Sequence, residues 1–112
     1  MRNIQPREIE TYRTQNGHEP FTEWFNTIRD VRTQTRIRRR LDRLEKGNLG
    51  DCGSVGSGIF ELRLHFGPGY RIYFGEVDRT IVLLLCSGDK STQTRDIQRA
   101  KTYWLEYKEG QR

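Results

Sequence analysis

Hydrophobic and polar residues alternate along FELRLHFGPGYRIYF, residues 60–74. Because successive side chains of a strand point to opposite faces, this alternation predicts two strands joined at the Gly-Pro-Gly turn. One face is apolar and is expected in the core: Phe60, Leu62, Leu64, Phe66, Tyr70, Ile72 and Phe74. A two-residue turn would mix the faces, so an odd-numbered loop is expected, which sets Arg63 opposite Tyr73. The same register places His65 opposite Arg71.

The spacing of apolar residues and of turn-forming residues divides the rest of the chain into elements. The predicted elements, in order, are a strand over 4–12, helices over 20–31 and 33–46, a loop over 47–58, the two hairpin strands, a strand over 80–86 and a helix over 92–108. The order strand-helix-helix-three strands-helix predicts one α+β domain, residues 1–112, with a small and mostly antiparallel sheet.

The chain is basic, with 20 Lys and Arg against 15 Asp and Glu and a formal net charge of +5. Sixteen of the 20 cations are arginine. The planar guanidinium group binds phosphate through two hydrogen bonds and stacks on bases, so this bias favours a nucleic-acid partner. A soluble basic protein with surface arginines explains the composition equally well.

The second predicted helix concentrates this charge on its outward face. Five arginines lie there within eight residues: Arg36, Arg38, Arg39, Arg40 and Arg43. The face can be a solvated surface that Asp42 and Glu45 partly neutralise, or a ridge that binds phosphates. We favour the ridge, because a face that serves only solubility normally mixes its signs. The predicted RNA or phosphate contacts are Arg36, Arg39, Arg40 and Arg43.

Several classes of protein are excluded by missing motifs. The chain has no G-x-S-x-G, no phosphate loop ending in Gly-Lys-Ser/Thr and no H-E-x-x-H, and no acidic cluster suggests magnesium. Cys52 and Cys86 form no C-x-x-C motif, so we expect a reduced cytoplasmic protein with no metal and no cofactor. The first ten residues hold no apolar segment and the longest apolar run is 81–86; neither a secretory signal nor a membrane span is expected.

Metal-free cleavage of RNA fits the polar face of the hairpin. The 2′-hydroxyl of RNA can attack the adjacent phosphate if the protein holds the geometry, moves two protons and stabilises the developing charge. Arg63 and Arg71 are candidates to stabilise the negative charge that develops on the phosphate, since their face of the hairpin shows no matching acids. The candidate proton-transfer residues are His65, Tyr73 and Lys90. Each of these residues also has a plain structural interpretation, such as an ion pair between Arg63 and Glu61.

Three segments carry a family resemblance: RLDRLEKGNLGD, ELRLHFGPGYRIYF and IVLLLCSGDKSTQTRDIQRAKTYW. They resemble the HigB-like, phage-derived addiction-module killer proteins of the RelE/ParE toxin superfamily, over about residues 21–107. The GPGYRIYF and GDKS-x-Q-x-x-DI blocks are the most specific. The resemblance implies the RelE/ParE-like fold and a type II toxin that cleaves mRNA on the ribosome without a metal. It also implies that Arg63, Arg71 and Lys90 form the basic site, with Tyr73 beside them.

The same resemblance implies partners and leaves alternatives open. A cognate antitoxin, usually a helix-turn-helix protein, is expected to hold the toxin inactive, and DNA is expected to be contacted only through that complex. ParE-like relatives share the fold but inhibit DNA gyrase. A relic that binds its antitoxin and does little else is a third possibility.

Overall fold

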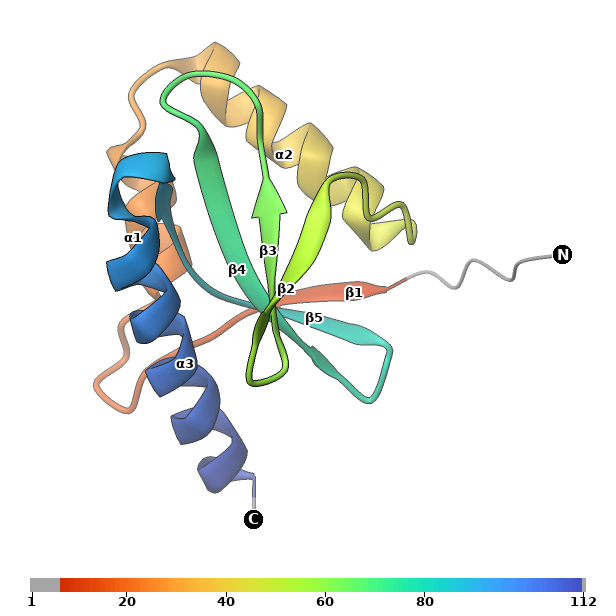
Figure 1. The fold of residues 1–112 in the computed structure, drawn as a ribbon, viewed down its shortest axis with the longest axis vertical. Helices are drawn as coiled ribbons and strands as arrows, with labels where there is room; N and C mark the ends of the chain where they lie inside the picture. Colours follow the sequence, from red (N-terminus) through yellow and green to blue (C-terminus); the bar gives the residue numbers. More distant parts are fainter. Residues whose placement is uncertain (1–6, 112) are drawn as a thin grey trace, which may run out of the picture.

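The computed structural model describes residues 7–111, which form one five-stranded sheet with helices on both faces (Figure 1). The elements in chain order are β1 Glu8–Thr11, α1 Pro20–Thr27, α2 Val31–Glu45, β2 Cys52–Gly56, β3 Ile59–Arg63, β4 Tyr70–Val77, β5 Ile81–Asp89, a 3-10 turn Lys90–Thr92 and α3 Gln93–Gly110. The strand order is β1-β5-β4-β3-β2. Only β1 and β5 pair in parallel within this sheet, and the other neighbours are antiparallel. The α+β class predicted from the sequence is confirmed.

Apolar side chains fill both faces of the sheet. The core under α1 and α2 comprises Phe21, Phe25, Ile37, Leu44, Leu62, Leu64, Ile72, Phe74, Val82 and Leu84. The core under α3 comprises Tyr12, Ile59, Tyr73, Leu83, Leu85, Cys86, Ala100 and Trp104. The apolar face of the hairpin is therefore core, as predicted. The second face was predicted to present Arg63, His65, Arg71 and Tyr73 as one polar site, but α3 covers much of it and Tyr73 belongs to the core there.

The hairpin register differs from the predicted one by two residues. Arg63 pairs with Arg71, and Glu61 pairs with Tyr73. The turn is longer than the Gly-Pro-Gly triplet, since the Leu64 amide donates to the Tyr70 carbonyl at 3.0 Å. An even shift keeps every side chain on its predicted face, which is why the faces are right although the partners are wrong.

The segment 47–58 is not entirely a loop. Its second half forms β2, which pairs with β3 and adds a fourth strand after the helices. The strand is rich in glycine and serine, so its pairing depends on backbone hydrogen bonds that leave no hydrophobic pattern. Val55 alone adds apolar packing against the core under α3.

The first helix ends earlier than its apolar spacing predicts. It stops at Thr27, and Asp30 caps the next helix by accepting a hydrogen bond from the Arg32 amide at 3.2 Å. Val31 therefore starts α2 and is 70% exposed rather than buried. Residues 4–6 of the predicted first strand lie outside the described part of the chain. No helix within residues 7–111 is long and apolar enough to span a membrane.

Candidate functional site

A groove of about 330 Å³ lies between α2 and the end of β3. Its lining residues are Arg36, Arg39, Arg40, Arg43, Arg63, Leu64, His65 and Phe66. The four arginines of α2 recur every three or four residues, a spacing that places them along one side of the helix. Among the described residues that line the groove there are five guanidinium groups and no carboxylate, so the groove suits a phosphate.

The rim of the groove is fixed by an aromatic contact. The Arg36 guanidinium carbon lies 3.8 Å from the centre of the Phe66 ring. A cation over an aromatic face is attracted to the ring, which limits the freedom of a long side chain. Phe66 belongs to the β3–β4 loop, so this contact joins the loop to α2 across the groove.

Arg40 departs from its predicted place on the outer face of α2. It is 7% exposed and belongs to the buried side of the helix together with Ile37 and Leu44. Its guanidinium donates to the Asn48 carbonyl at 3.4 Å and to the Leu49 carbonyl. Burial lowers the pKa of Arg40. The position of Arg40 therefore indicates that it anchors the loop after α2, with only part of the group facing the groove.

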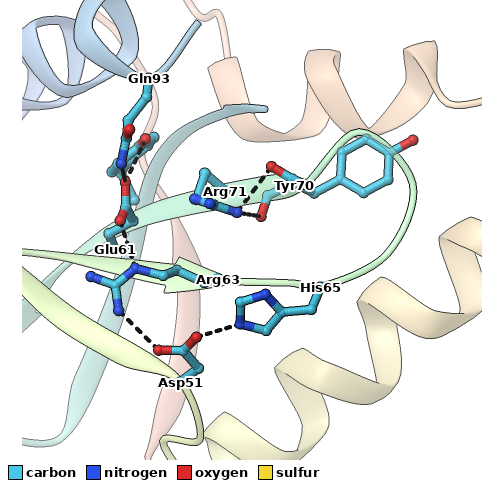
Figure 2. Close-up of polar contacts among 9 residues, drawn as sticks. Asp51, Glu61, Arg63, His65, Tyr70, Arg71 and Gln93 are labelled. Carbon is cyan, nitrogen blue, oxygen red and sulfur yellow. Dashed lines mark hydrogen bonds and ion pairs between the residues drawn. The ribbon is translucent and has the colours of Figure 1, made fainter. Parts of the chain in front are cut away.

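Glu61 is a buried carboxylate, 1% exposed, at the centre of the polar cluster (Figure 2). It accepts hydrogen bonds from Arg63 Nε at 2.9 Å, from the Tyr73 hydroxyl at 3.0 Å and from Gln93 Nε2 at 2.7 Å. These donors come from β3, β4 and the first turn of α3. Glu61 therefore ties the start of α3 to the sheet and fixes the direction of Arg63.

Asp51 is a second carboxylate that pairs with the hairpin. It accepts from Arg63 Nη1 at 2.9 Å and from His65 Nε2, as Figure 2 shows. The His65 hydrogen bond, followed by the Arg63 hydrogen bond, lowers the pKa of Asp51. The expectation that this face has no matching acids is thus wrong. Asp51 was missed because it precedes β2, the strand that the sequence pattern did not reveal.

Arg71 is almost buried, at 8% exposed, on β4. Its Nη1 donates to the carbonyls of Gly69 and Tyr70 at 3.0 and 3.2 Å. Its Nε is a buried donor with no hydrogen-bond partner among the described residues. A buried donor without a partner is costly, so Arg71 is held here at the expense of stability.

Lys90 and Arg71 both lie beside Gly69, at the position where a larger residue would have its side chain. A Cβ atom added to Gly69 would lie 3.4 Å from Lys90 Cβ and 3.5 Å from Arg71 Nη1. The absence of a side chain at Gly69 therefore leaves room for the stem of Lys90 and the Arg71 guanidinium on either side of it. Lys90 itself is exposed.

Tyr73 lies inside the core under α3 with no exposed surface. Burial and the hydrogen bond to Glu61 raise the pKa of its phenol well above the usual value. The hydroxyl therefore stays protonated at neutral pH and donates to Glu61. This position favours a structural role for Tyr73 over the predicted transfer of a proton.

Apart from the buried Tyr73 and the largely buried Arg40, the predicted site residues fall into two clusters. The groove brings together Arg36, Arg39, Arg43, Arg63 and His65, and the second cluster holds Arg71 and Lys90. Arg63 links them, because it lines the groove and also pairs with Arg71 across the two strands. Within residues 7–111, no three His, Cys, Asp or Glu side chains lie close enough together to hold a metal ion.

Comparison with known proteins shows one clear similarity. No protein-family model matches the chain. The chain is similar to an uncharacterized protein of Haemophilus influenzae strain Rd, with 47% identity over 81 residues, which is 72% of this chain and 82% of the other. Identity at this level extends over most of both proteins. The chain therefore belongs to the same protein family as this Haemophilus influenzae protein.

Proposed function

We propose that this protein is the toxin of a type II toxin-antitoxin system and cleaves mRNA on the ribosome without a metal ion. The observation that carries the proposal is the groove beside α2, whose described lining holds five arginines and one histidine but no carboxylate. The sequence resemblance to HigB-like killer proteins of the RelE/ParE superfamily supplies the class of activity. The RelE/ParE-like fold, the cytoplasmic location and the helix-turn-helix antitoxin are parts of the same proposal.

A concave cluster of arginines is a better fit to RNA than to a solvated surface. Each phosphate that an arginine neutralises releases counterions, so several guanidinium groups in one groove add binding energy. Arginine forks also give two parallel hydrogen bonds to one phosphate. A face that serves only solubility gains nothing from holding like charges together in a groove.

The chemistry of RNA cleavage assigns a role to each cluster. Arg63, held by Glu61 and Asp51, retains N–H groups that can bind a phosphate oxygen. The positive charges of Arg71 and of the exposed Lys90 can stabilise the additional negative charge that develops on phosphorus. Arg36, Arg39 and Arg43 would hold the flanking phosphates of the strand.

The test is induction of the protein in cells, followed by mapping of mRNA 5′ ends. The paired variants are Arg71→Ala, checked for folding by thermal melting, and the exposed substitution Arg39→Glu. The proposal predicts cleavage in phase with codons within minutes for the wild type, and strongly reduced cleavage for both variants. Growth arrest with intact mRNA would instead point to inhibition of gyrase. The absence of both growth arrest and mRNA cleavage would indicate a protein that only binds its antitoxin.

A further inference from the structure

His65 and Asp51 form a histidine–carboxylate pair at the wall of the basic groove. Asp51 Oδ2 is hydrogen-bonded to Nε2 of His65, and the two side chains are 43% and 69% exposed. His65 lines the groove with the arginines, whereas Asp51 is not one of its lining residues. The second ring nitrogen of His65, Nδ1, has no hydrogen-bond partner among residues 7–111. This nitrogen is thus free to exchange a proton with a ligand.

Asp51 is fixed by more than its contact with the histidine. Its carboxylate accepts from Arg63 Nη1 at 2.9 Å, and its backbone carbonyl accepts from the Arg63 amide at 3.0 Å. Arg63 is held in turn by the buried carboxylate of Glu61. An isolated surface ion pair would fix little, but here the chain Glu61–Arg63–Asp51–His65 extends from the core to the groove.

We propose, on the basis of the RNA cleavage proposed above, that His65 is the general acid of the reaction and that Asp51 positions it. The 2′-oxygen forms a bond to phosphorus, its proton passes to a solvent water, and the bond from phosphorus to the 5′-oxygen breaks. The proton on Nδ1 of His65 passes to the departing 5′-oxygen. The products are a 2′,3′-cyclic phosphate and a 5′-hydroxyl, and the imidazole regains its proton from solvent.

His65 is placed better than the other candidate proton donors, because its ring lines the groove beside the arginines. The alternative donors are placed less well, since Tyr73 is buried against Glu61 and Lys90 does not line the groove.

The test compares two mRNAs on programmed ribosomes, with either oxygen or sulfur at the 5′-bridging position of the mapped cleavage site. A thiolate leaves without needing a proton. Sulfur at this position therefore restores the cleavage rate only where the defect is loss of the general acid. We expect His65→Gln to slow cleavage of the oxygen substrate by about 10²- to 10⁴-fold. Asp51→Asn is expected to slow it by about 10- to 100-fold. His65→Gln should cleave the sulfur substrate at close to the wild-type rate, whereas sulfur should restore Asp51→Asn only in part, because Asp51 also holds Arg63.

Two control variants separate this role from others. His18→Gln alters the other histidine of the chain, which pairs with Glu23 at 2.9 Å outside the groove, and should cleave both substrates normally. Arg36→Gln removes a phosphate-binding group and should slow both substrates equally. If the wild type cleaves but His65→Gln is unaffected, or is slowed equally on both substrates, the general-acid role is wrong. A wild type that cleaves neither substrate contradicts the proposed function itself, and with it this inference.

Discussion

Arg63 lies directly opposite Arg71 in the β3–β4 ladder. Like charges at directly opposed positions destabilise a strand pair unless other groups compensate. Arg63 is compensated by Glu61 and Asp51, and Arg71 by the carbonyls of Gly69 and Tyr70. The protein therefore maintains two cations side by side at one end of the sheet, an arrangement that suits an anionic ligand better than it suits stability alone.

Glu61 should be essential for the stability of this arrangement. Glu61→Ala would leave three donors without their acceptor, one of them the charged Arg63. Arg63 is 33% exposed and keeps Asp51, so the main cost is the buried Tyr73 hydroxyl left without an acceptor, about 1–3 kcal/mol of unfolding free energy. Urea denaturation followed by tryptophan fluorescence measures this loss. Glu61→Gln keeps the shape of the side chain and an acceptor oxygen, so it serves as the milder control. A loss of less than about 1 kcal/mol in unfolding free energy for Glu61→Ala would show that Glu61 does not hold the cluster together.

The arginines of α2 should set the affinity for RNA and its dependence on salt. Arg36→Glu is expected to weaken binding of single-stranded RNA and to reduce the slope of log Kd against log salt by about 0.7 for each phosphate that the protein no longer neutralises. Fluorescence anisotropy of a labelled oligonucleotide at several salt concentrations measures both effects. Arg32→Glu makes the same charge change on α2 outside the groove lining. Equal effects of both variants would mean that net charge, and not the groove, governs binding.

Tyr73 should contribute to stability and not to cleavage. Tyr73→Phe removes one buried hydrogen bond to Glu61, at a cost of about 1–2 kcal/mol in unfolding free energy. The cleavage rate at neutral pH should stay at the wild-type level, because the raised pKa of this phenol keeps it protonated. If the folded variant cleaves about 10²-fold or more slowly, Tyr73 takes part in the reaction as a proton-transfer residue.

Asp51 should stabilise the protein in a pH-dependent way. Its pKa is held below the usual value of 3.8 by His65 and then by Arg63. The folded carboxyl binds its proton less tightly than the unfolded one, so its contribution is complete above about pH 4 and is lost as the pH falls through the lower folded value. Asp51→Asn should therefore lower the melting temperature at neutral pH, by an amount that shrinks as the pH falls below the ordinary carboxyl pKa. A difference that is independent of pH would contradict this assignment.

Much of the fold follows from the periodicity of the sequence. Alternation over 60–74 predicts the hairpin faces, and apolar spacing predicts all three helices to within a few residues. The strand β2 could not be predicted, because a strand of mostly glycine and serine leaves no periodic hydrophobic signal. The exact partners in β3 and β4 depend on the length of the turn, which the Gly-Pro-Gly triplet does not specify.

The site was less accessible to sequence analysis than the fold. The clustering of basic residues on α2 and the hairpin pointed to the groove, but a helix pattern could not show that Arg40 turns inward toward the Asn48 and Leu49 carbonyls. The pairing of Asp51 with His65 joins residues 14 positions apart across two strands. Such contacts depend on sheet topology, which a single sequence leaves open.

The most direct measurement is cleavage of a reporter mRNA by the purified protein, with and without ribosomes, read by primer extension. The wild type should produce discrete fragments bearing 5′-hydroxyl ends when ribosomes are present. The double variant Arg39→Glu/Arg43→Glu, which alters two exposed positions of the groove, should produce almost none. Intact mRNA under every condition with a folded wild-type protein, or full cleavage by the double variant, would contradict an RNA-cleaving groove beside α2.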